Sequence, residues 1–374
     1  MSENVTSIVV VAGETSGDLH GSALIKELKL LNPSLHFFGI GGNRMKEEGV
    51  SLVEHVDEMA VMGFTEVIWK YPFLKEAFIR LIKIIEKRGA ARAILIDYPG
   101  FNLRLARKLS QKEIPVTYFI SPQLWAWKEK RVKIIKNCVD NILCIFPFEE
   151  RWYKERGVEA TFIGNPLIEQ QDCEVTKTVF FDTYELKEKR TTIALLPGSR
   201  QQEVDRHLPI MIDTIRLLSY EGLKIQGVIG QAPAVSLNAY DVSDMVVVKE
   251  KPQLALRFAD VGIVSSGTAS LEAAIYGTPT VVIYKMSGVS WIVARFLATV
   301  SFASMTNLVA QKQVFPELLQ RQAKASNISS SLRSIIESSS IRNQMLSDMA
   351  YVREKLGSPG AVKRAARIIH DRLT

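Results

Sequence analysis

The stretch that decides the fold is residues 261–285, VGIVSSGTASLEAAIYGTPTVVIYK. Its apolar runs at 261–264 and 280–284 predict two short strands. Between the two runs, Thr268 can cap a helix at its start, and Gly277 can end that helix. The order strand, helix, strand predicts a βαβ unit with two parallel strands.

The first turn of this unit is a candidate anion site. Ser266, Gly267 and Thr268 lead from the first strand into the helix. A glycine-containing turn at a helix N-terminus presents free backbone N–H groups and a positive dipole end, which suits a phosphate. Glu272 follows one helical turn later, where a carboxylate can reach sugar hydroxyls. The alternative is an ordinary crossover without a ligand, which a Gly-Ser-rich turn taken alone would favour.

Length and composition indicate two globular domains and anionic partners. The chain has 374 residues, 47% of them hydrophobic, and a net charge of +7. This charge suits nucleotides, phosphorylated lipids, acidic membrane surfaces or nucleic acid. Cys138, Cys144 and Cys173 form no C-x-x-C pair, which disfavours a disulfide scaffold or zinc site and favours a reducing cytosol. No apolar run reaches the roughly 18 residues of a membrane-spanning helix, and the N-terminus does not resemble a signal peptide.

A second glycine-containing turn, GETSGD at 13–18, follows an apolar run at 8–12. The run is typical of a buried parallel strand, and the glycines indicate close approach of a ligand to the backbone. The spacing matches neither G-x-G-x-x-G nor G-x-x-x-x-G-K-[ST], so neither a dinucleotide site nor a P-loop is predicted. The candidate ligand contacts in this turn are Gly13, Glu14, Ser16, Gly17 and Asp18.

Asp97 is a candidate general base. It follows the apolar run at 93–96, and the carboxyl ends of strands are where open α/β sheets bind ligands. Alternatively, Asp97 caps a helix that starts near Asn102. Trp125 and Trp127 lie in the loop after the next strand, where they suit a wall around a sugar or acyl chain, although packing is the common role of tryptophan.

The segment from Met59 to Arg88 is strongly apolar with interleaved lysines and arginines. Pro72 predicts a division into two helical pieces. Two interpretations stay open from periodicity alone. One is a buried helix pair with a solvated basic edge, and the other is a basic, aromatic surface that lies on an anionic membrane. The candidate membrane or acyl contacts are Phe64, Ile68, Trp69, Phe73 and Phe78.

A second alternating series of strands and helices begins at Ile193, after a charged linker at 173–190. The turn Pro197-Gly198-Ser199-Arg200 leads into a helix that is expected to have Pro209 at its first position. Arg200 is a candidate phosphate contact. Two such series predict an α/β protein with two doubly wound, Rossmann-like domains facing a central cleft, an architecture that suits a nucleotide-sugar transferase.

Seven motifs, in this order and across nearly the whole chain, together resemble those of the lipid-A-disaccharide synthase family. The S-P-x-x-W-A-W and G-E-x-S-G-D elements are the most specific of them. The motifs are GETSGD at 13–18, AVMG at 60–63, SPQLWAWKEKRV at 121–132, PFE at 147–149, LLPGSR at 195–200, SGTASLEAA at 266–274 and PELLQ at 316–320.

This resemblance implies the two-domain GT-B fold and a glycosyl transfer with inversion. The donor would be UDP-2,3-diacylglucosamine, the acceptor 2,3-diacylglucosamine 1-phosphate, and the products UDP and a β-1,6-linked lipid A precursor. Asp97 would be the base for the acceptor 6-hydroxyl. The residues that would contact UDP or substrate are Ser199, Arg200, Ser266, Gly267, Thr268, Glu272 and Asn307, together with those of the 13–18 turn.

No D-x-D pattern occurs in the sequence, so helix termini and basic residues are expected to carry the diphosphate charge without a metal, and no cofactor is expected. Three positions depart from the family pattern: Gly100 replaces an aspartate, Met305-Thr306 precedes Asn307 in place of Leu-Pro, and Asn165 replaces a histidine. A UDP-sugar 2-epimerase and the lipid-linked transferase of peptidoglycan synthesis remain alternatives, because both share the fold. A catalytically silent membrane-surface module is a further alternative.

The expected domains are residues 1–172 for the acceptor and membrane side, 173–349 for the UDP-sugar, and a C-terminal helix in 350–374. That helix could cross back to the first domain or reach a partner subunit, and the resemblance permits a homodimer. The expected location is the cytoplasm, with peripheral association with the cytoplasmic face of the inner membrane. No nucleic acid partner is expected, because no RNA-recognition motif occurs.

Overall fold

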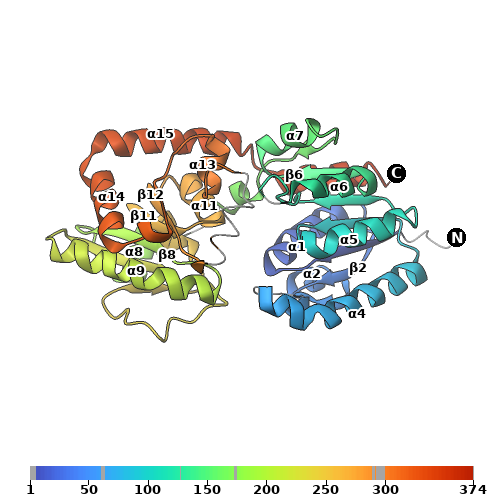
Figure 1. The fold of residues 1–374 in the computed structure, drawn as a ribbon, viewed down its shortest axis with the longest axis horizontal. Coiled ribbons are helices and arrows are strands. Elements are labelled where there is room, and N and C mark those ends of the chain that lie inside the picture. The colour runs from blue at the N-terminus through green and yellow to red at the C-terminus, as the bar shows by residue number, and fades with distance from the viewer. Residues whose placement is uncertain are drawn as a thin grey trace. The chain divides into compact units, whose positions relative to one another are not determined.

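The computed structural model describes residues 6–59, 64–126, 128–171, 175–288, 291 and 300–373, without the side chains of 64–69 and 170–171. Contacts divide the chain into two compact units (Figure 1). The first comprises Met1–Pro166 and Ser358–Thr374, and the second comprises Leu167–Gly357. The first unit thus ends a few residues before the limit expected from the sequence, because the 3₁₀ helix at Pro166–Gln171 already leads into the second.

The first unit is built on a seven-stranded parallel sheet with the order β3-β2-β1-β4-β5-β6-β7. Because every pair is parallel, the carboxyl ends of the strands gather along one edge. The strands are β1 Ser7–Ala12, β2 His36–Gly41, β3 Ser51–His55, β4 Arg92–Ile96, β5 Val116–Phe119, β6 Asn141–Cys144 and β7 Thr161–Phe162.

The helices of this unit cover both faces of its sheet. They are α1 Thr15–Leu31, α2 Asn43–Glu47, α3 Val56–Met59, α4 Phe64–Arg88, α5 Pro99–Ser110, the 3₁₀ helix Glu129–Arg131, α6 Val132–Cys138, α7 Pro147–Lys154 and α16 Ala361–His370. The last helix, α16, packs against α1, so the end of the chain lies in the same unit as its beginning.

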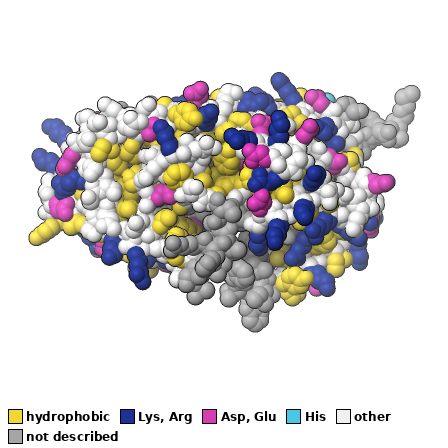
Figure 2. Space-filling model, turned by 45° about the horizontal axis from the view of Figure 1, so that its top comes forward, with side chains coloured by type: hydrophobic (Ala, Val, Ile, Leu, Met, Phe, Trp, Pro, Cys, Tyr) yellow, Lys and Arg dark blue, Asp and Glu magenta, His cyan; other side chains and the backbone are white. Residues whose placement is uncertain are grey.

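The surface is rich in basic side chains. Lys and Arg side chains are spread over the face drawn in Figure 2. Among the helices in the described part of the chain, none is long and apolar enough to cross a membrane.

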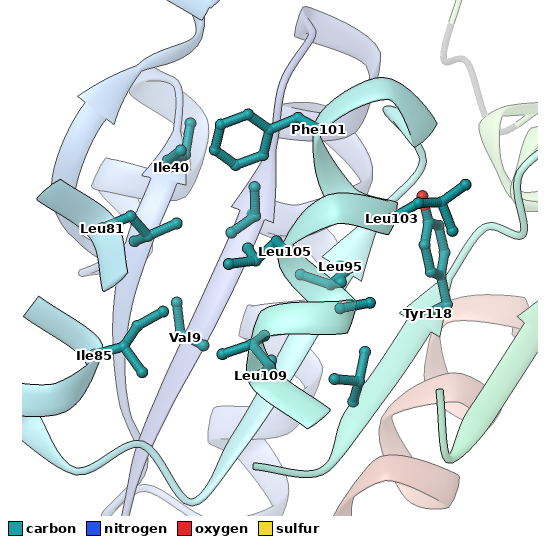
Figure 3. Packing of buried hydrophobic residues seen from close by; sticks show 14 of the residues in the cluster. Val9, Ile40, Leu81, Ile85, Leu95, Phe101, Leu103, Leu105, Leu109 and Tyr118 are labelled. Atoms are coloured by element: carbon teal, nitrogen blue, oxygen red, sulfur yellow. The ribbon is translucent and has the colours of Figure 1, made fainter. Parts of the chain in front are cut away.

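Successive residues of β1 point to opposite faces of the first sheet, and each face has its own core. Val9 packs in a cluster with Leu81 of α4 and Leu105 of α5 (Figure 3). Ile8 belongs to the cluster on the other face, which contains Ile369 of α16. A continuous apolar strand is therefore required here, since both of its faces are buried.

The second unit contains a six-stranded parallel sheet with the order β10-β9-β8-β11-β12-β13. Its strands are β8 Thr191–Leu196, β9 Ile225–Gly230, β10 Val246–Val248, β11 Val261–Ser265, β12 Thr280–Tyr284 and β13 Glu317–Leu319. Its helices are α8 Lys177–Thr183, α9 Gln201–Tyr220, α10 Gln253–Arg257, α11 Thr268–Tyr276, α13 Met305–Ala310, the 3₁₀ helix Gln320–Gln322, α14 Ala325–Glu337 and α15 Ser339–Lys355.

Four local expectations about helices were wrong. Pro72 lies inside the single helix α4, and Pro209 lies inside α9 and not at its start. A proline removes one helical hydrogen bond, but burial of the apolar stripe on both sides of it can hold the helix together. Gly267 and not Thr268 is the N-cap of α11. The helix α5 begins at Pro99, before Asn102, since proline is favoured at the first helical position.

Candidate functional site

Asp97 lies at the carboxyl end of β4, in a turn with a strained backbone. Asp97 and Tyr98 both have positive φ angles, 42° and 46°. Two consecutive non-glycine residues in this region cost free energy, so the surroundings must hold them there. The carbonyl oxygen of Asp97 accepts hydrogen bonds from Asn102 Nδ2 at 2.8 Å and from the Tyr118 hydroxyl at 2.5 Å. These two bonds fix the turn and leave the carboxyl group of Asp97 beside the sheet edge.

The carboxyl group of Asp97 is electrostatically perturbed. Loss of solvent contact, and then the negative charge of Glu14, raise its pKa to about 6. The backbone N–H of Tyr98 opposes this shift. A carboxylate with a pKa near 6 is ionised at neutral pH and is a stronger base than an exposed aspartate, which fits general-base chemistry.

The GETSGD turn lies next to Asp97, because β1 pairs with β4. Gly13 cannot be replaced without a clash, since an added Cβ would lie 2.2 Å from the Tyr98 ring. Glu14 and Ser16 are exposed at the edge, and Gly17 is buried against Ala12.

Asp18 is buried and faces α2. Its carboxylate accepts hydrogen bonds from the backbone N–H groups of Gly42 at 2.7 Å, Met45 at 3.0 Å and Arg44 at 3.2 Å. These are donors at the start of α2 that have no partner within the helix. The structure therefore gives Asp18 contacts that support the fold of the edge.

Glu149 connects two of the motifs and was not singled out from the sequence. Its fully buried carboxyl group accepts hydrogen bonds from Ser121 Oγ at 2.8 Å and Trp125 Nε1 at 2.9 Å, and from the N–H of Phe146 at 3.0 Å. Burial raises its pKa to about 7. The signal in the sequence was a glutamate in the first turn of a helix after a strand, a position suited to capping. Trp127 lies outside the described residues.

The second unit has a pocket of about 330 Å³ at the carboxyl ends of β8, β9 and β11. The structure brings six of the residues predicted to contact UDP or substrate together in its lining: Ser199, Arg200, Ser266, Gly267, Thr268 and Glu272. The Glu203 carboxylate accepts from the Ser199 N–H at 3.2 Å and fills the space beside Gly198, whose φ is +135°. Arg200 is exposed and precedes the first residue of α9.

The β11–α11 turn carries the pocket's N–H groups. Gly267 has a φ of +147°, which L side chains rarely adopt, while no atom lies within 4 Å of an added Cβ. Glycine is therefore required by the backbone conformation and leaves open space above the helix N-terminus. Ser266 Oγ donates to the carbonyl of Ala303 at 2.6 Å. Loss of solvent contact raises the pKa of Glu272, whose side chain lines the pocket.

One buried side chain, His207, connects two segments that surround this pocket. His207 Nδ1 donates to the Pro197 carbonyl at 2.8 Å, and its Nε2 accepts from the Lys285 N–H at 2.9 Å, which fixes a neutral tautomer. Burial lowers the pKa of His207, in agreement with that state. The histidine thus joins the turn before α9 to the end of β12.

Asn307 does not line the pocket. It is fully buried, and its Oδ1 accepts from the N–H groups of Val314 at 2.8 Å and Phe315 at 2.9 Å. Its Nδ2 donates to the Phe315 carbonyl at 2.9 Å and to Glu317 Oε1 at 2.8 Å. Both the oxygen and the nitrogen of the amide group therefore make hydrogen bonds that fix the turn before β13.

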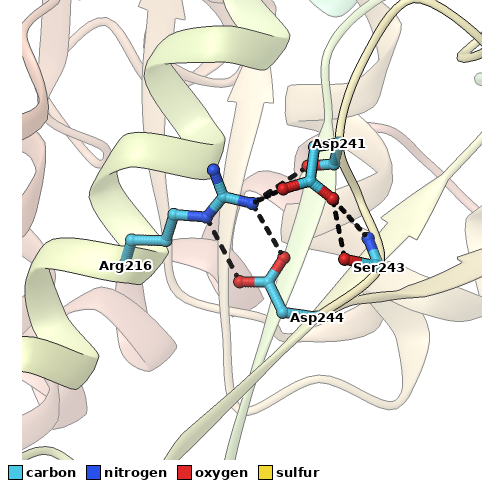
Figure 4. Close-up of polar contacts among 4 residues, drawn as sticks. All are labelled: Arg216, Asp241, Ser243 and Asp244. Atoms are coloured by element: carbon cyan, nitrogen blue, oxygen red, sulfur yellow. Dashed lines mark hydrogen bonds and ion pairs between the residues drawn. The ribbon is translucent and has the colours of Figure 1, made fainter.

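The loop after β9, which contributes Ala232 to the pocket, is attached to α9. Arg216 of α9 donates to Asp241 Oδ2 at 2.8 Å and to both carboxylate oxygens of Asp244 (Figure 4). Asp241 is in turn held by Ser243 Oγ at 2.7 Å. Because these groups are exposed, the contacts are expected to fix the loop more than to stabilise the fold.

The candidate acyl contacts are only partly described. The side chains of Phe64, Ile68 and Trp69 lie outside the described residues. Phe73 and Phe78 are half-buried and pack against the core cluster on the α4 face of the first sheet.

Comparisons with known proteins agree with this geometry. A family model described as lipid-A-disaccharide synthetase matches residues 8–369. The lipid-A-disaccharide synthase of Myxococcus xanthus is 39% identical over 377 residues, which cover 99% of this chain and 98% of that protein.

Two solved structures show the fold. The UDP-GlcNAc 2-epimerase of Neisseria meningitidis bound to UDP-GlcNAc has a TM-score of 0.65 at 13% identity and covers 98% of this chain and 99% of that chain. The glycosyltransferase of kitacinnamycin has a TM-score of 0.66 at 14% identity and covers 99% of both chains. The expected two-domain GT-B fold is therefore confirmed.

Proposed function

The chain belongs to the lipid-A-disaccharide synthase family of glycosyltransferases, and on that premise we propose the reaction that it catalyses. It transfers 2,3-diacylglucosamine from UDP-2,3-diacylglucosamine to the 6-hydroxyl of 2,3-diacylglucosamine 1-phosphate. The new bond is β-1,6, the anomeric configuration inverts, and UDP leaves.

Inversion in one displacement needs a base on the acceptor side. As the acceptor 6-oxygen attacks the anomeric carbon, the bond from that carbon to the UDP oxygen breaks. Asp97 takes the proton from the 6-hydroxyl. The observation that carries this assignment is a carboxyl group at a strand end, in a strained turn, with a pKa raised to about 6.

The donor nucleotide is assigned to the pocket of the second unit. Arg200 and the N-terminus of α11 supply positive charge for the diphosphate, and this charge also stabilises the leaving group. The Glu272 carboxylate accepts hydrogen bonds from ribose hydroxyls. Support comes from the gathering of these groups around one 330 Å³ pocket.

We also propose peripheral association with the cytoplasmic face of the inner membrane. Both substrates carry acyl chains, so the enzyme must take them from a bilayer. On α4, Ile79 is an exposed apolar side chain, 44%, beside exposed Lys83. Basic residues near an anionic surface favour association by about 1 kcal/mol each. A homodimer stays a prediction from the family resemblance, which light scattering can check.

The deciding experiment is mass spectrometry of the product formed from defined diacyl substrates. A disaccharide 1-phosphate from the acylated pair, and none from unacylated UDP-glucosamine derivatives, is the expected result. Conversion of an unacylated UDP-sugar to its epimer, or transfer to a peptidoglycan lipid, would replace this function with one of its alternatives. UDP binding without any turnover would indicate a silent module.

A further inference from the structure

An apolar cavity of about 540 Å³ lies between α4 and the start of α5 in the first unit. Its apolar lining comes from one stripe of α4 and from the first residues of α5, with the capping tyrosine: Tyr71, Leu74, Phe78, Tyr98, Gly100 and Phe101. The rings of Phe78 and Phe101 meet edge to face with centroids 5.4 Å apart. Leu74, Phe78, Tyr98 and Phe101 belong to the core cluster or pack against it, whereas Tyr71 is exposed at the rim.

Two cations line the same cavity. Lys75 and Arg104 are both exposed, and neither takes part in an ion pair found between described residues. Positive charge at the mouth of an apolar cavity favours an occupant that combines a hydrocarbon body with a negative charge.

The cavity is next to the proposed base. Tyr98, one of its walls, directly follows Asp97, so the Cα atoms of the two residues are about 3.8 Å apart. The Tyr98 hydroxyl donates to the carbonyl of Met59 at 3.0 Å, and its ring covers Gly13. The tyrosine is thus held on the boundary between the cavity and the turn that carries Asp97.

We infer that this cavity binds an acyl chain of the acceptor, with Lys75 and Arg104 facing the acceptor's phosphate. The inference rests on the proposed function, since it takes the acceptor to be a diacylated sugar phosphate. It assigns the cavity to the acceptor and not to membrane lipid, because the cavity adjoins Asp97, where the acceptor hydroxyl must lie. An anionic sugar with apolar chains also has the charge and polarity that the lining requires.

Gly100 gives a way to fill the cavity without disturbing the fold. No atom lies within 4 Å of a Cβ added at Gly100, and its backbone is in the first turn of α5. Gly100→Phe therefore places a ring at the mouth of the cavity at little cost to the helix. The matched control is Ser110→Phe, which adds the same ring at an exposed position at the other end of α5.

The test compares acceptors that carry tetradecanoyl or butanoyl chains, at saturating donor. We expect Gly100→Phe to raise the KM for the tetradecanoyl acceptor about tenfold, which corresponds to displacing roughly two methylenes. The rise should be smaller for the butanoyl acceptor, and Ser110→Phe should behave as the wild type. Arg104→Gln should raise the KM for the phosphorylated acceptor more than for the same sugar without phosphate.

The outcomes separate the inference from the proposed function. If folded Gly100→Phe keeps the wild-type ratio of the two KM values, the cavity does not bind the chain. If its vesicle binding falls while that ratio stays constant, the cavity serves the membrane and the inference is overturned. If the wild type transfers to neither acceptor, the proposed function fails. Calorimetric binding of the tetradecanoyl acceptor to wild type and Gly100→Phe then decides the cavity's role by itself.

Discussion

The two units have the same kind of sheet edge but use it differently. In the first unit, the turn after β4 presents a carboxyl group, Asp97, whose pKa is raised to about 6. In the second unit, the turn after β11 presents backbone N–H groups through Gly267, and Arg200 lies in the same pocket. The difference matches the two roles that we propose for these turns. Proton transfer needs a side chain with a perturbed pKa, whereas binding a diphosphate needs hydrogen-bond donors in fixed positions and positive charge.

The largest expected effect is on the chemical step. We expect Asp97→Asn to lower kcat by about 10²–10⁴-fold, because the amide cannot accept the hydroxyl proton. UDP affinity should stay unchanged, since the nucleotide is assigned to the other unit. The measurements are steady-state kinetics and UDP calorimetry on the purified variant.

The melting temperature is the control for this variant. Burial disfavours the charged form of Asp97, so a neutral amide of the same shape should not destabilise the turn. A folded Asp97→Asn enzyme with near-wild-type kcat would remove Asp97 from the role of base and leave the first unit without an assigned catalytic group.

The second largest expected effect is on UDP binding in the pocket of the second unit. We expect Glu272→Ala to weaken UDP binding by about 1.5–3 kcal/mol, the range for hydrogen bonds to a charged group. Glu272→Gln should lose less, because its amide oxygen still accepts. Unchanged UDP affinity by calorimetry in a folded Glu272→Ala variant would contradict the ribose contact.

Asp18 sharpens the comparison within the first unit, because its carboxylate, among the described residues, accepts hydrogen bonds from backbone N–H groups at the start of α2. Asp18→Ala leaves buried N–H groups unbonded and should cost about 1–3 kcal/mol of unfolding free energy. At roughly 2–4 °C per kcal/mol, the melting temperature should fall by several degrees. Loss of turnover at an unchanged melting temperature would instead favour the ligand contact predicted from the sequence.

The sequence was sufficient for the strands that are buried on both faces. Continuous apolar runs such as 8–12 and 261–264 predict strands of a parallel sheet, because helices cover both faces of such a sheet. It was not sufficient for β3 at Ser51–His55, which is only half-buried and has no continuous apolar run. The helix boundaries predicted at Pro72 and Pro209 were wrong, because burial of the apolar side chains on both sides outweighs the loss of one helical hydrogen bond.

In the candidate site, too, some contacts could be predicted from the sequence and others could not. Residues close in the chain, such as Ser266 to Glu272, were predicted as a group because one turn and one helix place them together. The partners of Asp18 and Asn307 could not be predicted, since they are backbone groups that only the folded chain brings near. Glu149 was missed because its donors Ser121 and Trp125 belong to a different strand-end loop.

The smallest expected effect concerns the charge next to Asp97. Because Asp97 must be ionised to accept a proton, kcat/KM should fall about tenfold per pH unit below an apparent pKa near 6 and level off above it. The negative charge of Glu14 contributes to that raised pKa, after burial. Glu14→Gln removes the charge and should move the acidic limb to lower pH, so that the variant keeps relatively more of its activity in mild acid. The shift should be small, since burial, the larger cause, remains.

The measurement is the pH profile of kcat/KM for wild type and variant. An acidic limb that stays in place would show that the Glu14 charge does not act on the group that titrates, and one that moves to higher pH would contradict the assignment of that ionisation to Asp97.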